Sequence, residues 1–219
     1  ADNVRICGRG ILDMSRIKEL PVAIDPKLAA ERKAKGFAIT NAKRRDAIRL
    51  EFCDNALVEG IAIRDSLLHA VRPIGCRNLV IDNVKICGNW RCDSDGIDMR
   101  NCENVRVRNC FVRTFDGAIC VKGFDCCMGE KDMLHDGTRH DVFTNAVVEG
   151  CTVWCDWGRS LAFGAETRAE AIRDVTWRNC DLIHNAHAAC ELQNCDYADI
   201  HGVLFEDIRV DLEDRPQRS

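Results

Sequence analysis

Seven copies of one nine-residue pattern recur along this 219-residue chain and restrict what it can fold into. Each copy opens on a small polar turn residue, alternates apolar with polar residues, and is interrupted at its sixth position by Gly, Asn or Asp. Alternation with period two is typical of a β-strand, and the polar interruption indicates a turn. The copies begin at Asn3, Asn55, Asn78, Asn104, Asn145, Asp174 and Gly202.

The spacing of the copies predicts how these strands are arranged. From Asn55 onward the intervals are 23, 26, 41, 29 and 28 residues, which is the length of a solenoid coil with insertions. A second alternating segment precedes most copies. We therefore predict an all-β fold, a right-handed parallel β-helix forming a single domain over residues 1–219. Equal positions of successive coils then stack about 4.8 Å apart. The columns that begin at Val4 and Ile6 are expected to be buried.

Two insertions interrupt the coils, at residues 14–45 and 124–144. In the first, Pro26 and Gly36 bracket a segment suited to a helix, so we expect one helical excursion at residues 26–36. A solenoid needs caps at its ends, and neither end of the sequence shows one. We therefore expect a fragment of a longer chain, whose missing N-terminal part would hold a cap and an export signal.

The composition excludes some functional classes. No apolar run approaches 18 residues, so a membrane span is not expected. The formal net charge of −4 offers no electrostatic case for a nucleic-acid partner. The sequence leaves the oligomeric state open.

The 15 cysteines are interpreted as mainly structural. Most fall into two repeat columns, as expected of buried stacks of a small apolar side chain. No Cys-x-x-Cys pair has zinc-finger spacing, and no metal or other cofactor is expected. In the second insertion, Cys126 and Cys127 are expected to be exposed, and His135, Asp136 and His140 to form a lid or, as an alternative, a metal site. The two columns are Cys53, Cys76, Cys102 and Cys195, and Cys110, Cys151 and Cys180.

The residue before each second strand suggests where chemistry occurs. Reading along the coils, this column predicts that Asp95 and Asp116 are neighbours, with His69 on one side and Arg159 on the other. Two carboxylates flanked by cations can have different pKa values, as general acid and base catalysis on a glycosidic bond requires. The alternative is that both are turn formers. The column comprises Asp46, His69, Asp95, Asp116, Arg159 and Ala188.

Two segments resemble a known family. The segment from Cys92 to Asp98, reading CDSDGID, and that from Phe115 to Lys122, reading FDGAICVK, are similar to the polygalacturonase family of glycoside hydrolases, which has the pectin-lyase-like parallel β-helix. The family signatures are Asn-Thr-Asp-Gly, an Asp-Asp pair, Gly-His-Gly and Arg-Ile-Lys. The resemblance implies that Asp116 is the general acid and Asp95 part of the base in an inverting hydrolysis.

The departures from these signatures identify a divergent branch. Gly117 replaces the second Asp of the pair, which implies impaired catalysis. Arg159 stands where the family has His. Glu191 and Gln193 replace the Arg and Lys that bind the substrate carboxylate, which argues against an unmodified galacturonide as substrate.

Polar and aromatic residues near these positions are candidate contacts for substrate. Exposed indoles stack well on sugar rings, and Trp154 is a further candidate of this kind, whereas Trp177 falls on an inward position. For each polar residue, the alternative is a solvated outer side chain. Arg72 shares an outward column of the second strands with Asp98 and Glu191. The candidates are His69, Trp90, Asp93, Asp98, Arg100, Lys122, Trp157, Arg159, Glu191 and Gln193.

Three functions fit these observations. The first is a secreted, extracellular or periplasmic glycoside hydrolase that acts on a polysaccharide or oligosaccharide. The second, supported by Gly117, is a carbohydrate-binding solenoid that has lost catalysis. The third is a polysaccharide lyase, in which Asp93, Asp95 and Asp116 would bind Ca²⁺ and Arg159 would act as the base.

Overall fold

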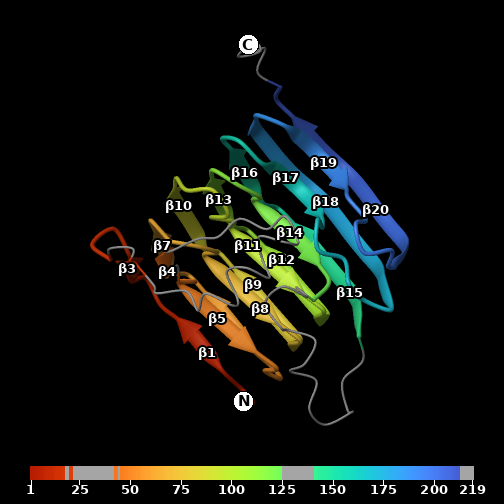
Figure 1. Cartoon of the computed structure of the whole chain (residues 1–219), viewed down its shortest axis with the longest axis horizontal. Helices are drawn as coiled ribbons and strands as arrows, with labels where there is room; N and C mark the ends of the chain where they lie inside the picture. Colours follow the sequence, from red (N-terminus) through yellow and green to blue (C-terminus); the bar gives the residue numbers. More distant parts are fainter. Residues whose placement is uncertain (18–19, 22–41, 44, 125–140, 213–219) are drawn as a thin grey trace.

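The computed structural model describes residues 1–17, 20–21, 42–43, 45–124 and 141–212 (Figure 1). Within them the chain consists of strands and turns without a helix, and none of these residues form a helix that could cross a membrane. The helical excursion predicted at residues 26–36 lies outside the described residues, as do Cys126, Cys127 and the candidate lid residues His135, Asp136 and His140.

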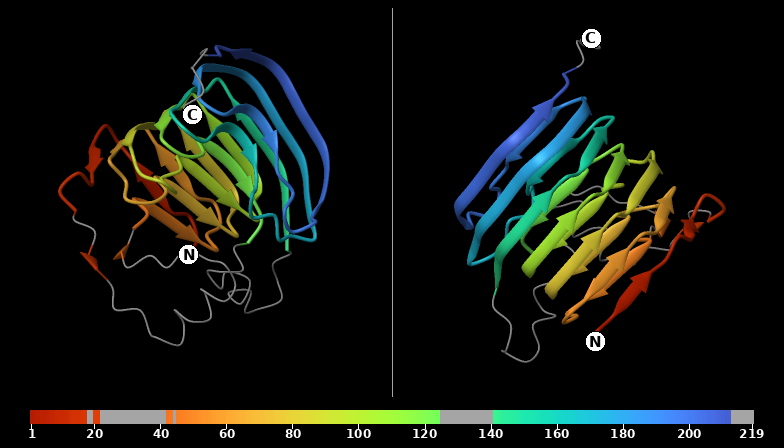
Figure 2. Two further views of the ribbon diagram at one scale, coloured as in Figure 1. Left: turned by 45° about the horizontal axis from the view of Figure 1, so that its top comes forward. Right: turned by 180° about the vertical axis from the view of Figure 1, so that it is seen from behind.

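Three stacked faces of parallel strands form the walls of a solenoid (Figure 2). The first contains β1 (Arg5–Cys7), β6 (Leu57–Glu59), β9 (Arg77–Asp82), β12 (Glu103–Arg108), β15 (Val142–Glu149), part of β18 (Ala171–Asn185) and β20 (Asp199–Val210). The second contains β2 (Ile11–Asp13), β7 (Ala62–Arg64), β10 (Lys85–Asn89), β13 (Phe111–Thr114), β16 (Thr152–Cys155) and the rest of β18. The third contains β5 (Ile48–Glu51), β8 (Val71–Ile74), β11 (Ile97–Arg100), β14 (Ile119–Lys122), β17 (Arg159–Phe163) and β19 (Ala188–Leu192).

Strand β18 belongs to two faces, because residues 171–178 pair with β15 and residues 181–185 pair with β16. Among the described strands, only β3 (Leu20–Pro21) and β4 (Ala42–Lys43) are antiparallel. Crossovers between parallel strands are right-handed, so the chain winds as a right-handed parallel β-helix, and the predicted fold class is confirmed. Strand β15 starts at Val142, so the second insertion ends before residue 144, where the sequence had placed its end.

The turn positions of the repeat adopt left-handed backbone conformations. The opening Asn residues have φ of about +55°, for example 56° at Asn55 and 55° at Asn78, and the sixth positions Gly60 and Asn83 have φ of 76° and 52°. Asn and Gly are the residues that tolerate this region best. The opening side chains also bond along the solenoid, with Asn78 Nδ2 donating to Asn55 Oδ1 at 3.0 Å. The repeat therefore encodes two turns in every coil.

The predicted inward columns pack in the core. Val58, Ile81, Val107, Val148 and Trp177 are fully buried and lie in register on successive strands, as do their partners in the neighbouring column. At the ends of the columns Val4, Ile6, Val203 and Phe205 are half-buried, because each has a neighbouring coil on one side only among the described residues.

The cysteine interpretation holds with one correction. Cys53, Cys76 and Cys102 of the first column are buried as predicted, and so is the whole second column. Cys195 was expected in the first stack and is instead exposed. It lies beyond β19, where the chain forms a turn and no further coil covers it within the described residues.

The register between β11 and β14 differs from the prediction by one residue. Matching the glycines would have paired Gly96 with Gly117, but Ile97 pairs with Ile119 and Met99 with Val121. The observed register stacks apolar residue on apolar residue in the core, whereas the predicted one would have placed Ile119 beside Asp98. Apolar burial therefore outweighs the glycine pattern. Extending the register, Asp95 lies opposite Gly117, and Asp116 is displaced by one residue from the predicted column.

Candidate active site

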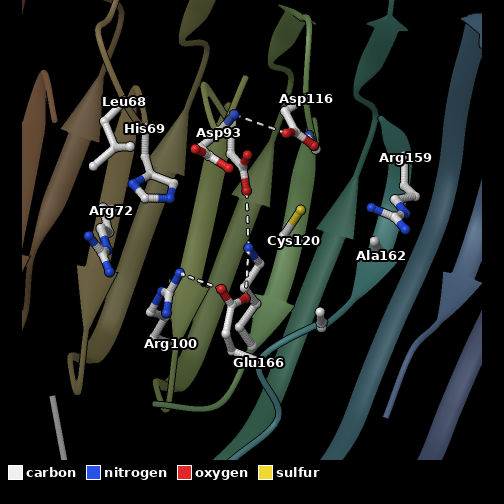
Figure 3. A pocket seen from close by; sticks show the side chains of 15 residues that line it. Leu68, His69, Arg72, Asp93, Arg100, Asp116, Cys120, Arg159, Ala162 and Glu166 are labelled. Carbon is white, nitrogen blue, oxygen red and sulfur yellow. Dashed lines mark hydrogen bonds and ion pairs between the residues drawn. The ribbon is translucent and has the colours of Figure 1, made fainter. Parts of the chain in front are cut away.

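A cavity of about 340 Å³ opens on the outer side of the third face (Figure 3). Strands β8, β11, β14 and β17 supply its floor, and the turns before these strands, with the loop after β17, supply its walls. All four residues of β11 and of β14 are buried, although only alternate residues face the core. Their outward polar side chains are therefore buried against one another.

Most of the predicted site residues meet in this cavity. His69, Asp93, Asp95, Arg100, Asp116, Lys122 and Arg159 line it. Arg72, which the sequence placed in one outward column with Asp98 and Glu191, lines it as well, whereas the lining residues Cys120 and Glu166 were not predicted. Glu166 follows β17 in a loop outside the repeat, so no periodicity marks it. Cys120 occupies an outward position of β14, in one column with Arg72 and Asp98, and that register is the signal that could have identified it.

A buried ion-pair network occupies the floor. Lys122 Nζ lies 3.1 Å from Asp95 Oδ2, 2.8 Å from Asp98 Oδ2 and 3.2 Å from Glu166 Oε2. Burial alone would lower the pKa of Lys122, but Asp95 and Asp98 outweigh it and hold the pKa well above its usual value. The ammonium is therefore a fixed positive charge at the centre of the cavity.

Arg100 completes this network from the same strand as Asp98. Its Nε donates to Asp98 Oδ1 at 2.7 Å, and its Nη2 lies 3.9 Å from Glu166 Oε1. Burial would raise the pKa of Asp98, but Arg100 and Lys122 outweigh burial and hold it well below the usual value. The same two cations overcome the burial of Glu166 and lower its pKa to about 2. Both carboxylates are ionised at any physiological pH.

Asp95 differs from its neighbours in its proton affinity. Burial raises the pKa of Asp95 to about 6, and Lys122 only partly opposes this. Only 5% of the residue is exposed. A carboxyl group with this pKa can exchange a proton near neutral pH.

Asp116 is positioned by backbone donors. Its Oδ2 accepts a hydrogen bond from the Asp93 N–H at 3.0 Å, and its Oδ1 accepts one from the Gly117 N–H at 2.9 Å. The first of these bonds ties Asp116 to the turn that carries Asp95, so the two carboxylates are held on adjacent turns at one end of the cavity. Asp116 is half-buried and therefore more open to a ligand than Asp95.

His69 and Arg72 form a second polar group at the other side of Asp95. His69 Nδ1 lies 2.8 Å from Asp46 Oδ1, and its Nε2 lies 3.5 Å from Asp98 Oδ2. Arg72 Nη1 lies 3.7 Å from Asp46 Oδ2. Burial would raise the pKa of Asp46, but His69, Arg72 and Arg49 together outweigh burial and the pKa is lowered. Asp46 therefore anchors both basic side chains from behind.

The C-terminal side of the cavity is closed by Arg159, whose guanidinium forms an ion pair with Glu191 of the next strand. Of the predicted contacts, Asp98 and Glu191 thus act behind lining residues rather than on the surface of the cavity. Gln193 is half-buried and does not line it either.

The predicted aromatic contacts lie elsewhere. Trp90 is half exposed but lines a different cavity, on the second face beside Arg113. Trp154 is part of β16 rather than of a turn, and its ring stacks on His184 at 4.9 Å. Trp157 is half exposed and stacks on Phe115 at 5.5 Å, outside the lining of the candidate site. The prediction that Trp177 belongs to the core is confirmed.

Two groups of side chains have metal-ligand types close together. His69, Asp95 and Asp98 place ligand atoms within 4.8 Å of one another, as do Cys92, Asp93 and Asp116. In the first group the Lys122 ammonium already contacts both carboxylates. The second group is largely exposed, and its arrangement is explained by the bond from Asp93 N–H to Asp116. Neither arrangement requires a metal ion.

The sequence profile of glycosyl hydrolases family 28 matches residues 30–212, which is most of the chain. The chain belongs to this family. Among curated family relatives, the polygalacturonase of Brassica napus is 25% identical over 183 residues, covering 78% of this chain and 40% of that protein. The polygalacturonase of Medicago sativa is 25% identical over 185 residues, covering 83% of this chain and 38% of that protein.

Two solved exopolygalacturonase structures share the fold. An exopolygalacturonase from Thermotoga maritima superposes with a TM-score of 0.71 at 18% identity, covering 96% of this chain and 53% of that one. The family 28 exopolygalacturonase of Yersinia enterocolitica gives a TM-score of 0.60 at 14% identity, covering 99% of this chain and 48% of that one. This family 28 chain therefore spans about half the length, or less, of the proteins it matches.

Proposed function

We propose that this chain carries the active site of a glycoside hydrolase that cleaves a polysaccharide or oligosaccharide in the cavity above β8, β11, β14 and β17. Asp116 would act as general acid and Asp95 as general base, with inversion at the anomeric carbon. The observation that supports this most directly is that Asp95, with its pKa raised to about 6, lines the same cavity as Asp116 in a family 28 chain.

The environments of the two carboxylates suit these roles. A base is stronger when its pKa is raised, and burial does this for Asp95. Asp116 is the more accessible of the two, so it can reach a leaving oxygen. Its two oxygens accept hydrogen bonds from the Asp93 N–H and the Gly117 N–H, which fix the orientation of the carboxyl group. Substrate would have to displace one of these bonds as Asp116 takes up the proton that it donates.

Gly117 leaves Asp95 without a carboxylate opposite it, on the side where the family has the second Asp of its pair. Water would then be oriented and deprotonated by Asp95 alone. General acid and base groups each contribute about 10² to 10⁴ in rate, so the loss of one member of a base pair implies slow but measurable turnover. A polymeric glycan is too large to cross a membrane unaided, which supports action in the extracellular or periplasmic space.

A screen of the full-length protein against a polysaccharide panel tests the proposal. Release of reducing ends supports a hydrolase, provided that Asp116→Asn reduces it by about 100-fold or more while substrate binding persists. Retention of a glycan without turnover would favour the carbohydrate-binding alternative, which rests on Gly117. A chelator-sensitive unsaturated product would instead identify a lyase, in which Asp93, Asp95 and Asp116 would hold Ca²⁺ and Arg159 would act as the base.

A further inference from the structure

Every cation that lines the cavity, within the described part of the chain, is already paired with a carboxylate of the protein. Lys122 contacts Asp95, Asp98 and Glu166. Arg100 donates to Asp98 at 2.7 Å. Arg72 faces Asp46 at 3.7 Å, and Arg159 is paired with Glu191. A carboxylate on a ligand would therefore have to compete with a protein carboxylate for each of these groups.

The net charge around the cavity also disfavours an anionic ligand. Four cations line it, and four carboxylates line it beside them. Three further carboxylates, those of Asp46, Asp98 and Glu191, contact the cations from behind. The fixed charge around the cavity is therefore acidic whenever the carboxylates are ionised, and a like charge brought into such a site is disfavoured.

The paired side chains remain suitable for hydroxyl groups. A carboxylate in an ion pair keeps lone pairs that accept from a sugar hydroxyl, and a guanidinium or ammonium keeps N–H groups that donate to one. An uncharged ring can thus be held by the existing pairs without breaking any of them. A free carboxylate gains a strong bond here only by separating a pair that already exists.

Arg159 is the cation that determines whether the cavity binds an uncharged ring or a ring with a free carboxylate. Its side chain is 30% exposed, compared with 1% for Arg72, 2% for Arg100 and 9% for Lys122. It is therefore the only one of the four that a ligand could reach without disrupting the buried network. Its partner Glu191 lies on the last strand of the third face, one coil beyond Arg159.

We propose that the cavity selects a sugar ring without a free carboxylate, either a neutral sugar or an esterified uronate, and that Glu191 enforces this by holding Arg159. The inference rests on the proposed function, because it takes the cavity to be the glycan site. It deepens that function by naming the class of ring that the cavity accepts.

Binding of matched ligands tests the inference separately from catalysis. Isothermal titration of full-length protein carrying Asp116→Asn would use galacturonate and glucuronate trisaccharides and their methyl esters, which differ only in the charge of the carboxyl group. We expect the esters to bind about 10-fold or more tightly than the free acids. Adding Glu191→Gln should release Arg159, tighten the binding of the acids, and narrow that ratio by at least about 3-fold.

Glu149→Gln is the matched control. It removes a Glu carboxylate from a different Arg–Glu pair, in which Arg178 Nη2 lies 2.6 Å from Glu149 Oε2. This pair lies on the first face, away from the cavity. It should leave the ratio of ester to acid affinity unchanged. Acids that bind as tightly as their esters, or a Glu191→Gln protein whose ratio equals that of the control, would overturn the inference while leaving a glycan site. Failure of correctly folded protein to bind any of the four ligands or the panel polysaccharides would contradict both the proposed function and the inference.

Discussion

The Cys120 thiol occupies the space that a side chain at Gly117 would need. A Cβ atom on Gly117 would lie 2.5 Å from Cys120 Sγ, a separation that real structures essentially never show, and 3.4 Å from Asp95 Oδ2. The φ angle of Gly117 lies outside the left-handed region, so crowding rather than backbone strain keeps this position empty. Loss of the second carboxylate and the presence of Cys120 are thus two parts of one local arrangement.

We therefore predict that Gly117→Asp alone will not restore a carboxylate pair. Overpacking against Cys120 should lower stability by about 1–3 kcal/mol without a gain in turnover. The double variant Gly117→Asp/Cys120→Ala lacks the obstructing Cys120 sulfur atom, so its turnover should rise by about 10-fold. This is less than a well-placed base contributes, because the contacts that would support the new carboxylate are absent.

Turnover and melting temperature should be measured on the same preparations, with Cys120→Ala alone as the control. A double variant that is as stable as this control, yet gains no activity on a substrate that the parent protein cleaves, would contradict the role assigned to Asp95 and its missing partner.

A second prediction concerns the pH dependence of activity. Burial raises the pKa of Asp95 to about 6, so a base at this position loses activity as pH falls through 6. The rate with a substrate below saturation should show an ascending limb centred near pH 6. A limb centred near pH 4, the usual value for Asp, would show that the base is not this buried carboxyl group.

Asp95 should also affect stability in a defined direction. Its pKa is raised in the folded state, so the folded protein binds this proton more tightly than the unfolded chain between about pH 4 and pH 6. The stabilisation from proton uptake is therefore present at low pH and lost as pH rises through 6. The free energy of unfolding of Asp95→Asn, taken relative to that of the wild-type protein, should be about 1–3 kcal/mol larger at pH 7.5 than at pH 4.5. Urea denaturation at both pH values measures this difference. A difference that does not vary with pH would refute the raised pKa.

Lys122 is predicted to be essential for stability. Lys122→Met would leave Asp95 without its ammonium partner and Asp98 and Glu166 with Arg100 alone, and removing one partner of a buried ion pair costs about 3–5 kcal/mol. Arg178→Met breaks an exposed pair with Glu149 and should cost less than about 1 kcal/mol. Denaturant unfolding of both variants at pH 7 measures the contrast. Equal losses would mean that the network is more hydrated than its burial indicates.

The exposure of the thiols makes a further prediction. Native protein treated briefly with iodoacetamide should be alkylated at the exposed cysteines, whereas the buried ones should react only after unfolding, because the reagent needs access and a thiolate. Burial raises the pKa of the Cys120 thiol well above its usual value, which protects it further. Peptide mapping by mass spectrometry distinguishes the sites. Protection of Cys195 from alkylation would support its predicted place in the first buried cysteine column. Among the cysteines that the structure describes, the exposed ones are Cys7, Cys87, Cys92, Cys190 and Cys195.

The repeat pattern determined the fold because its information is local. Alternation specifies which side chains face inward, and Asn or Gly at the two turn positions specifies where the backbone takes a left-handed conformation. Stacking of identical coils then follows from the pairing of parallel strands. The same periodicity also brought residues as distant as His69 and Arg159 to one face of the molecule.

The register between neighbouring coils was decided by core packing rather than by the repeat pattern. The sequence alone predicted Asp95 opposite Asp116, but Gly117 takes that place, because the pairing of Ile97 with Ile119 buries more apolar surface than a match of glycines. A slip of one residue changes which side chains stack, and only the packed core decides between such alternatives.

The pairing of charges was likewise decided by the tertiary structure. The sequence identified Lys122, Arg159 and Glu191 as candidate contacts, but it could not show that Lys122 is enclosed by three carboxylates or that Glu191 holds Arg159. Glu166 reaches the network from a loop that has no repeat signal. Residue types and periodicity therefore determined the solenoid and the location of the site. Which charged side chains form ion pairs depends on contacts between separate coils, and these contacts form only when the coils stack. The electrostatics of the cavity therefore follow from the tertiary structure.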